Sequence, residues 1–379
     1  MGRRQKPDKP LRVLVIGCGR ASRDHFRAIS YFEKRGYLAL EGLVDRDCEA
    51  IEEVIKSRQS RMSVPLASDN LDVMLAQRSF DIAVIATPPS THAYLAKKVL
   101  AAGAHLIVEK PLTLDADQAK LLVETARERR LTLATGLKYR YIPGVSTIKS
   151  LIQSGQLGDV LYGTTTVLWG HDQAYYDQAD WFGTWSAEGG ALMNQSIHAL
   201  DLMAWLMDAQ PVEATAVLAR QCHDIEAADL VMGVLSLEGN RYLLLEGTTN
   251  TNPEQHEAAF FLRCERGTIR ASFLGGKPSV SVLGDDGKQY GRKLMFDAVR
   301  NHIRREGIGV LRQIGNPYTF LYADMIDAIR DGKSPIAPGE AGLDSLVHAL
   351  TLLEAGKNKQ TVPFPPGNFR IEDMVGYFD

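Results

Sequence analysis

Short aliphatic runs alternate with amphipathic segments along the first third of the chain. The expected strands are residues 11–16, 38–44, 81–86, 105–108 and 131–135. Between them, apolar residues recur at helical spacing over 24–34, from about residue 47, after residue 92 and over 115–130. A repeated strand–helix pattern predicts an α/β fold with a doubly wound parallel sheet.

The pattern changes in the remaining two thirds of the chain. Helical spacing predicts helices over 143–154, 191–207, 317–330 and 340–355. Strand-like segments at 160–168, 212–218, 230–237, 241–248, 258–263 and 268–271 are separated by turn signals such as Gly239-Asn240. Residues 284–287 indicate a hairpin, and 299–313 are ambiguous. This half is predicted to be an α+β domain with a large, open, mostly antiparallel sheet.

Composition narrows the class of protein. The 379 residues are 45% hydrophobic and 23% charged, and the net charge of −3 argues against nucleic acid or an anionic membrane as a partner. The four cysteines form no CxxC pair, which predicts reduced thiols in a cytoplasmic protein and no metal site. Residues 1–10 are basic without a hydrophobic segment behind them, so we expect a disordered leader rather than a secretory signal.

A glycine turn follows the first strand directly. In Gly17-Cys18-Gly19-Arg20-Ala21-Ser22, Gly17 allows a tight turn and Gly19 allows the backbone to approach a pyrophosphate at a helix N-terminus. Ser22 replaces the third glycine of the dinucleotide fingerprint, which lowers the specificity of the motif.

The second strand ends in an acidic residue. Asp45 lies where a carboxylate meets the adenosine ribose hydroxyls, which favours NAD. Arg46 follows and could hold a 2′-phosphate, so NADP stays open. The alternative role for Asp45 is to cap the helix that begins near Asp47.

Two further strand ends carry polar residues. The strand 81–86 runs into Thr87-Pro88, with His92 starting the next helix, and the strand 105–108 ends in Glu109-Lys110-Pro111. Lys110 therefore faces the crevice where α/β sheets bind ligands, and burial there would make it a proton carrier near neutral pH. The alternative interpretation of Lys110 is a lysine in a loop, exposed to solvent and without a catalytic role. Gly17, Asp45, Thr87 and Lys110 all fall at strand carboxyl ends.

These motifs together resemble one family. GCGRAS, ATPPSTH and VEKPL are similar to the Gfo/Idh/MocA family of nicotinamide-dependent oxidoreductases, and the resemblance runs from about residue 11 to about residue 365. It implies a dinucleotide-binding domain at 11–136, a substrate-binding and oligomerisation domain at 137–379, and Lys110 beside the nicotinamide ribose and substrate. The expected cofactor-binding residues are Gly17, Gly19, Arg20, Ala21, Asp45, Arg46, Thr87, Pro88, His92, Glu109 and Lys110.

The second half carries candidate substrate residues. Tyr139-Arg140-Tyr141-Ile142-Pro143 resembles the family's N-R-F-x-P stretch, which implies that Arg140 lies near the active site. The loop 171–185 holds Tyr175, Tyr176 and Trp181 among acids and amides, which suits sugar rings and hydroxyls. The alternative is that these aromatics are core. Phe182 stands where many members have arginine, which puts a phosphate or carboxylate contact from that position in doubt.

A glycine pair, Gly189-Gly190, opens the helix 191–207. Asn194 and His198 are four residues apart and share one face, and Asp201 lies one turn further on. The stretch resembles the family's G-G-x3-D-x-G-x-H-x2-D motif, with Asn194 for aspartate and Ser196 for glycine. An amide cannot act as a general base, so proton transfer falls to Lys110 and His198. Asn194 is expected to bond a substrate hydroxyl, and Asp201 to orient His198, cap the helix or face solvent.

The sequence therefore predicts an NAD(P)-dependent sugar or polyol dehydrogenase acting on CH–OH groups. The expected catalytic residues are Lys110, His198 and Asn194, and the expected substrate-binding residues are Lys110, Arg140, Tyr175, Tyr176, Trp181, Asn194 and His198. The alternatives are an NAD-assisted glycoside hydrolase and a non-catalytic nucleotide sensor. The partners expected are a carbohydrate and further copies of the chain, in a homodimer or homotetramer. The tail 362–379 has no functional interpretation.

Overall fold

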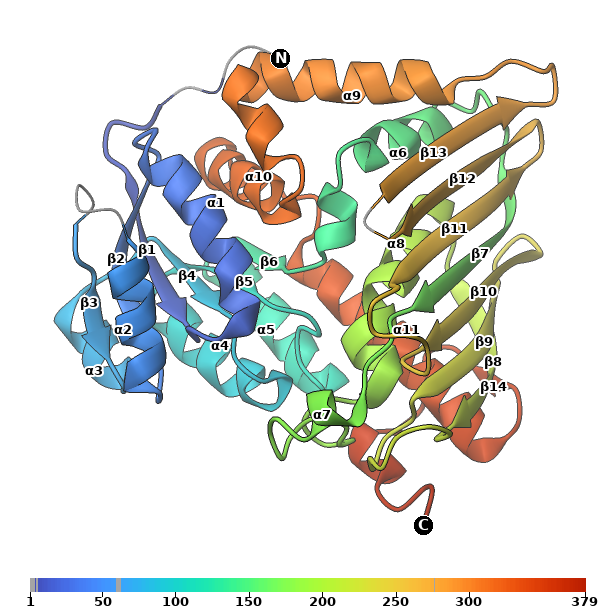
Figure 1. Cartoon of the computed structure of the whole chain (residues 1–379), viewed down its shortest axis with the longest axis horizontal. Helices are drawn as coiled ribbons and strands as arrows, with labels where there is room; N and C mark the ends of the chain where they lie inside the picture. Colours follow the sequence, from blue (N-terminus) through green and yellow to red (C-terminus); the bar gives the residue numbers. More distant parts are fainter. Residues whose placement is uncertain (1–3, 5, 59–62, 276) are drawn as a thin grey trace. The chain divides into compact units, whose positions relative to one another are not determined.

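The computed structural model describes residues 4, 6–58, 63–275 and 277–379. The chain forms two compact units (Figure 1). Unit 1 comprises Met1–Thr113, Asp117–Ile142 and His302–Leu343, and unit 2 comprises Leu114–Ala116, Pro143–Asn301 and Asp344–Asp379. This division differs from the expected boundary at 136/137, because a distant segment of the chain returns to unit 1.

The sheet of unit 1 is parallel, with strand order β3-β2-β1-β4-β5-β6. Its strands are β1 (Leu11–Ile16), β2 (Leu38–Val44), β3 (Leu66–Ser68), β4 (Ile82–Ile85), β5 (His105–Val108) and β6 (Leu133–Thr135). The residues of β4 are fully buried, which explains why the aliphatic runs do not alternate. The predicted doubly wound sheet is confirmed. β3 was not predicted because its three residues carry no buried apolar signal.

The helices of unit 1 mostly lie where the spacing placed them. They are α1 (Arg23–Glu33), α2 (Cys48–Ser57), α3 (Leu71–Gln77), α4 (His92–Ala101), α5 (Ala116–Glu128), whose first residue is assigned to unit 2, and α10 (Pro317–Asp331). Not every apolar residue of α4 is buried. Tyr94 is exposed, with the Lys98 ammonium 4.5 Å from its ring centroid.

α10 explains why unit 1 is discontinuous in sequence. Its apolar side chains share one hydrophobic core with α1 and the parallel sheet, including Leu321 and Met325, which are fully buried. Asn316 caps α10 through Tyr318 N at 3.1 Å and donates to Asp24 O at 2.9 Å, which ties α10 to the start of α1. Such long-range burial cannot be deduced from a helical period.

The leader makes ordered contacts through Arg4. Residues 1–3 and 5 lie outside the described residues, but Arg4 is buried, which differs from the expected disorder. Its guanidinium pairs with Glu306 at 2.6 Å and with Asp327. Two carboxylates satisfy a charge that would be costly to bury alone.

The sheet of unit 2 has the order β13-β12-β11-β7-β10-β9-β8-β14. Its strands are β7 (Val160–Leu168), β8 (Pro211–Ala219), β9 (Leu230–Leu237), β10 (Arg241–Thr248), β11 (Glu257–Cys264), β12 (Gly267–Leu274), β13 (Lys277–Gly284) and β14 (Val362–Pro363). β7 and β10 are parallel and the other pairs antiparallel, so the predicted large, mostly antiparallel sheet is confirmed. The helices α6 (Val145–Gln153) and α7 (Gln173–Tyr176) precede and follow β7.

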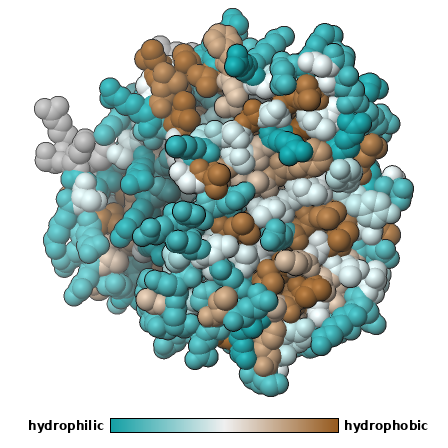
Figure 2. All heavy atoms as spheres, turned by 45° about the vertical axis from the view of Figure 1, so that its right-hand side comes forward, coloured by the Kyte–Doolittle hydropathy of each residue, from teal (hydrophilic) through white to brown (hydrophobic). Residues whose placement is uncertain are grey.

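One face of this sheet is covered by helices. α8 (Ile197–Met207) and α11 (Gly339–Asn358) pack on it so closely that a Cβ at Gly163 would lie 2.6 Å from Met203, and one at Gly233 would lie 2.6 Å from Leu352. Side chains of the central strands alternate accordingly: Leu243 and Leu245 are buried, whereas Tyr242 and Leu244 are exposed. Figure 2 brings forward the right-hand side of Figure 1, where the strands of this sheet lie, and shows hydrophobic, intermediate and hydrophilic residues mixed over it.

The ambiguous segment 299–313 contains the end of α9 (Gly291–Glu306) and a 3₁₀ segment, Ile308–Gln313. Within α9 only Gly291 and Ala298 are buried, so most of this helix lacks a buried face. No helix among the described residues is long and apolar enough to cross a membrane.

Candidate functional site

The glycine turn after β1 has the geometry that the motif predicts. Gly17 has φ of +97°, and a Cβ there would lie 2.5 Å from Ala86 O, so only glycine fits. A Cβ at Gly19 would meet no atom within 4 Å, so the exposed backbone borders open space. Ser22 is buried and its hydroxyl donates to Gly19 O at 2.7 Å, which closes the 3₁₀ turn Arg20–Ser22 before α1. The turn therefore leaves room for a phosphate at the start of a helix.

Asp45 joins the end of β2 to this turn. Its carboxylate accepts from Cys18 N at 2.6 Å and from Asp47 N at 2.9 Å. The α2 cap is Asp47, which accepts from Glu49 N and Ala50 N, so the alternative role for Asp45 is filled by its neighbour. Burial and the Asp45 charge raise the pKa of Cys18 to about 12, which keeps this residue a neutral thiol.

His92 holds two strand ends together. It is fully buried, with Nδ1 2.8 Å from Pro111 O and Nε2 2.9 Å from Thr87 O, and burial lowers its pKa despite these contacts. The sequence assigns His92 to cofactor binding. Because both ring nitrogens are occupied within the protein, we assign it instead to positioning the Thr87 and Lys110–Pro111 segments.

Lys110 lies two residues after the end of β5 and is half-buried. The adjacent Glu109 is buried and accepts from Tyr318 OH at 2.6 Å, with His25 Nε2 2.8 Å from the same oxygen. Burial would raise the pKa of Glu109, but His25, Tyr318 and the Lys110 charge together lower it to about 2. The carboxylate that the sequence assigned to the cofactor is thus an anion bound inside unit 1, next to Lys110.

Arg140 lies in the 3₁₀ turn Lys138–Tyr141 of unit 1. It is buried, and its Nη1 donates to Ile336 O at 3.0 Å. The neighbouring Tyr141 OH donates to Asp324 at 3.0 Å. Part of the guanidinium expected to meet substrate is therefore used to hold the segment after α10.

The expected helix 191–207 is irregular where it carries Asn194. Leu192–Ser196 forms a π-helical turn, and α8 begins only at Ile197. The prediction of a continuous α-helix is therefore wrong at its start. Gly190 opens the segment with φ of +67° and no room for a Cβ, which would lie 2.7 Å from Ala228 O. π-Helical turns are frequent at functional sites because they displace side chains from the regular spacing.

Asn194 is held by an acidic residue that the sequence did not indicate. Its Nδ2 donates to Glu188 and lies 3.5 Å from Tyr175 OH. Glu188 is buried and also accepts from Gly183 N at 2.6 Å. Asn194 replaces the family's aspartate, and the Glu188 carboxylate lies beside its amide. The site therefore still holds a carboxylate, supplied by a different residue.

His198 and Asp201 are both buried on α8, with 5% and 2% of their surfaces exposed. Asp201 lies in the helix interior, so it neither caps the helix nor faces solvent. Of the three roles expected for Asp201, orientation of His198 is the one that stays a prediction.

The aromatic loop divides into core and accessible residues. Trp185 is fully buried, and Tyr176 is buried with its hydroxyl donating to Thr249 at 2.9 Å. Tyr175 is half-buried and stacks on His171 with ring centroids 3.6 Å apart, and Trp181 is half-buried against Phe182. Tyr176 is therefore better assigned to the core, whereas Tyr175 and Trp181 stay candidates for sugar stacking.

Sequence reasoning missed His25, Tyr318 and Glu188. His25 follows the glycine fingerprint closely, and Tyr318 and Tyr322 are four residues apart in the mostly apolar first half of α10. Polar aromatics at that spacing could have indicated a buried polar cluster. The described residues contain no group of three or more His, Cys, Asp or Glu side chains that could hold a metal ion.

Two family models match the chain. Residues 11–137 match the model described as "Oxidoreductase family, NAD-binding Rossmann fold", and residues 145–270 match the "GFO/IDH/MocA C-terminal domain". The chain belongs to the GFO/IDH/MocA family. This membership confirms the family expected from the three motifs and the NAD-binding domain expected from the glycine turn.

Relatives in this family include carbohydrate dehydrogenases. UDP-N-acetylglucosamine 3-dehydrogenase of Acidithiobacillus ferrooxidans is 31% identical over 55% of this chain and 58% of its own length. Inositol 2-dehydrogenase of Rhizobium meliloti is 25% identical over 55% of this chain and 58% of its own length. The chain thus spans little more than half the length of these curated relatives.

A solved structure covers more of the chain. The WlbA dehydrogenase of Bordetella pertussis, in complex with NADH and UDP-GlcNAcA, is 26% identical with a TM-score of 0.81. The alignment covers 95% of this chain and 99% of that one. The two-unit architecture of this chain is therefore that of a GFO/IDH/MocA dehydrogenase.

Proposed function

We propose that the protein is an NAD-dependent dehydrogenase that acts on a hydroxyl carbon of a sugar, polyol or nucleotide sugar. The observation that carries the proposal is the position of Lys110. It follows β5, while Gly17, Asp45 and Thr87 follow the neighbouring strands β1, β2 and β4 at the same edge of one parallel sheet. Ligands of such sheets bind at this edge.

The residues at this edge fit a dinucleotide. The glycine turn and the start of α1 would bind the pyrophosphate, and Asp45 would accept from ribose hydroxyls. Thr87 and Pro88 would border the cofactor at the end of β4. Arg20, Ala21 and Arg46 are exposed beside the turn. Because Arg46 could bind the 2′-phosphate of NADP, the site is compatible with NADP as well as NAD. NAD supplies the hydride acceptor when bound.

The protein's own chemistry is proton transfer and orientation. We assign the substrate hydroxyl proton to Lys110, His198 or both, because each can accept a proton in its neutral form. Asn194, an amide, would hydrogen-bond a hydroxyl without taking its proton. Tyr175 and Trp181 would contact a ring face.

Among substrate classes we place nucleotide amino sugars first. The 31% identity to the UDP-N-acetylglucosamine enzyme and the fold similarity to WlbA, solved with UDP-GlcNAcA, support this order. Inositols come second, since the similarity to inositol 2-dehydrogenase is lower.

The test is an absorbance assay for reduced nicotinamide. The purified protein would be mixed with NAD, and separately NADP, against UDP-N-acetyl amino sugars, inositols, hexoses and sugar acids. Turnover with one class identifies the substrate, and a preference for NAD supports the role of Asp45. If the protein binds NAD but no substrate in the panel produces reduced nicotinamide, the proposal is overturned and the hydrolase alternative is favoured.

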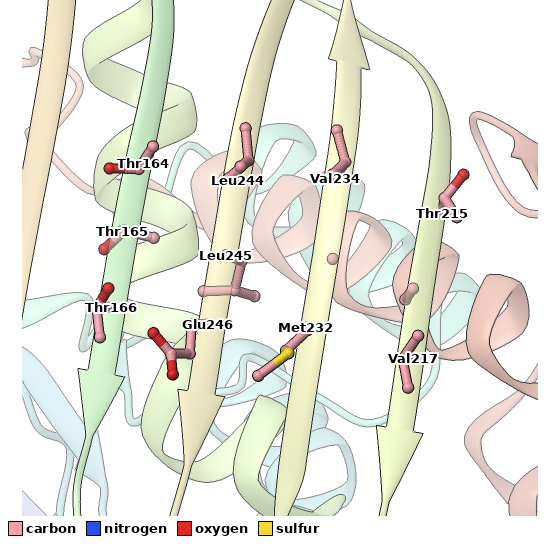
Figure 3. A pocket seen from close by; sticks show the side chains of 12 residues that line it. Thr164, Thr165, Thr166, Thr215, Val217, Met232, Val234, Leu244, Leu245 and Glu246 are labelled. Atoms are coloured by element: carbon pink, nitrogen blue, oxygen red, sulfur yellow. The ribbon is translucent and has the colours of Figure 1, made fainter.

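We infer in addition that the outer face of the unit 2 sheet binds a second copy of the chain. Figure 3 shows side chains from the four adjacent strands β7, β10, β9 and β8, which line a shallow hollow there. The exposed members of this face include Tyr162, Val217, Met232, Tyr242 and Leu244. Contiguous exposed apolar side chains on a sheet are typical of subunit interfaces.

The paired substitution Met232→Glu with Leu244→Glu tests this interface. Sedimentation velocity should show dimers or tetramers for the parent and a smaller species for the variant. Val73→Glu, which changes an exposed apolar residue on α3, is the control and should leave the mass unchanged. A parent that sediments as a monomer would rule the interface out.

A further inference from the structure

Glu109 lies at the centre of a buried polar cluster in unit 1. Its Oε1 is 2.8 Å from His25 Nε2 and accepts from Tyr318 OH at 2.6 Å, and its Oε2 accepts from Lys110 N at 3.3 Å. Tyr322 OH is 3.0 Å from His25 Nδ1. An isolated carboxylate would be costly to bury, and these contacts stabilise its charge.

The two tyrosines stay protonated. Burial and the negative charge of Glu109 raise the pKa values of Tyr318 and Tyr322 well above the usual range. The Tyr318 hydroxyl is therefore a permanent donor to the carboxylate. The ring of Tyr318 also packs on His25, with centroids 4.2 Å apart.

The backbone at Gly136 packs directly against this carboxylate. A Cβ at Gly136, just after β6, would lie 2.8 Å from Glu109 Oε1 and 3.1 Å from Oε2. Three separate parts of the chain therefore enclose one side chain: α1, the end of β6 and α10.

We propose that His25, Glu109, Tyr318 and Tyr322 form a positioning cluster that fixes Lys110 and places a permanent negative charge beside its ammonium group. This inference rests on the proposed function only in taking Lys110 as the proton carrier. Glu109 holds the backbone nitrogen of Lys110, and His92 holds Pro111 O on the other side at 2.8 Å. The cluster members act through Lys110 and are not themselves catalytic residues.

Several titratable groups face the members of this cluster. They are Asp24 and His25 on α1, His92 on α4, Lys110 after β5, and Tyr318 and Tyr322 on α10. Removing the Glu109 charge removes stabilisation of the Lys110 ammonium, so Lys110 should lose its proton at lower pH. A general base would then become active at lower pH.

The experiment compares Glu109→Gln with the matched control Glu33→Gln. Glu33 is another paired carboxylate of unit 1, half-buried near the other end of α1, where it accepts from Leu40 N at 2.9 Å and pairs with Arg58. The readouts are the pH dependence of kcat, the melting temperature, and a pH titration of the ¹³C-dimethylated Lys110 resonance without cofactor, assigned with Lys110→Arg.

We expect Glu109→Gln to lower kcat at least about tenfold and to move both the rising limb of activity and the Lys110 resonance titration about one pH unit lower. Glu33→Gln should lower the melting temperature only. If Glu109→Gln fails to fold, Tyr318→Phe takes its place and should change kcat and the Lys110 resonance while leaving NAD affinity intact. Unchanged limbs and resonance positions in folded variants would overturn the inference.

Failure of this inference is distinguishable from failure of the proposed function. If Lys110→Met abolishes turnover while the cluster variants keep the parent's pH profile, Lys110 is the proton carrier and the cluster is purely structural. If Lys110→Met retains turnover, the proton role itself is wrong. The Lys110 resonance still tests the cluster in that case, because it is read without catalysis.

Discussion

Units 1 and 2 hold their candidate residues in contrasting ways. In unit 1, Lys110 ends a buried strand, and its neighbours Glu109 and His92 are buried and hydrogen-bonded to the protein. In unit 2, Asn194 lies on a π-helical turn, and Tyr175 and Trp181 lie half-buried on or beside a short helix. One unit fixes a charge, and the other presents amide and aromatic groups.

This contrast suggests a division of work. A proton carrier needs a fixed position and a controlled field, which buried partners on regular elements provide. Recognition of different carbohydrates needs accessible groups that can be exchanged without disturbing a core. Substitutions in unit 1 should therefore affect turnover of every substrate, and those in unit 2 should affect the choice among substrates.

The largest effect is expected for Lys110→Met. Loss of the amine should lower kcat at least about a hundredfold with every substrate, because general-base catalysis contributes about that much. NAD affinity, measured by calorimetry, should match the parent. Lys97→Met changes an exposed lysine of unit 1 and serves as the control. Near-normal turnover in Lys110→Met would contradict the assignment of proton transfer to unit 1.

The charge on Glu109 should appear as acid sensitivity of folding. Its pKa falls from the ordinary value of 4.5 to about 2, so its stabilising contribution is complete above about pH 4.5 and is lost as the pH falls towards 2. A shift of this size is worth on the order of 3 kcal/mol. In urea unfolding, Glu109→Gln should therefore show a flatter stability curve below pH 4.5. The exposed Glu53→Gln should retain the parent's slope.

His198→Ala tests whether unit 2 also takes part in proton transfer. We expect kcat to fall at least about tenfold and one limb of the pH profile to disappear, because an imidazole titrates in the working range. Kinetics from pH 5 to 9 would measure both changes. An activity and pH profile equal to the parent's would make His198 a structural residue and leave proton transfer to unit 1.

Two aromatic residues of unit 2 should separate recognition from packing. Trp181→Ala should raise KM severalfold with little change in melting temperature, since Trp181 is only half-buried. Tyr176→Phe should cost about 1 kcal/mol of stability through the lost Thr249 bond and leave KM within about twofold. The reverse result would exchange the assignments of these two residues.

The sequence predicted unit 1 better than unit 2 for a physical reason. Strand, turn and helix in unit 1 follow from local spacing, so the placement of Gly17, Asp45 and Lys110 at strand ends needed no tertiary information. The roles of Glu109 and His92 did need it, because their partners, Tyr318 among them, come from other elements.

Local spacing could not predict the site geometry of unit 2. The π-helical turn at Leu192–Ser196 and the bond from Asn194 to Glu188 lie on either side of Gly190, whose backbone packs against Ala228 from another part of the chain. Nothing in the residue pattern distinguishes this turn from an ordinary helix start. Burial of Tyr176 alongside the more accessible Tyr175 likewise results from packing and not from composition.

The return of α10 to unit 1 has a consequence for synthesis and recombination of this chain. Glu109 leaves the ribosome 209 residues before its partner Tyr318, so unit 1 cannot complete its interior while translation is still within unit 2. A gene fragment that stops after Ile142 would encode a nucleotide-binding unit without the helix that encloses this carboxylate. Exchange of substrate units between relatives would therefore have to preserve the later segment His302–Leu343 together with the first.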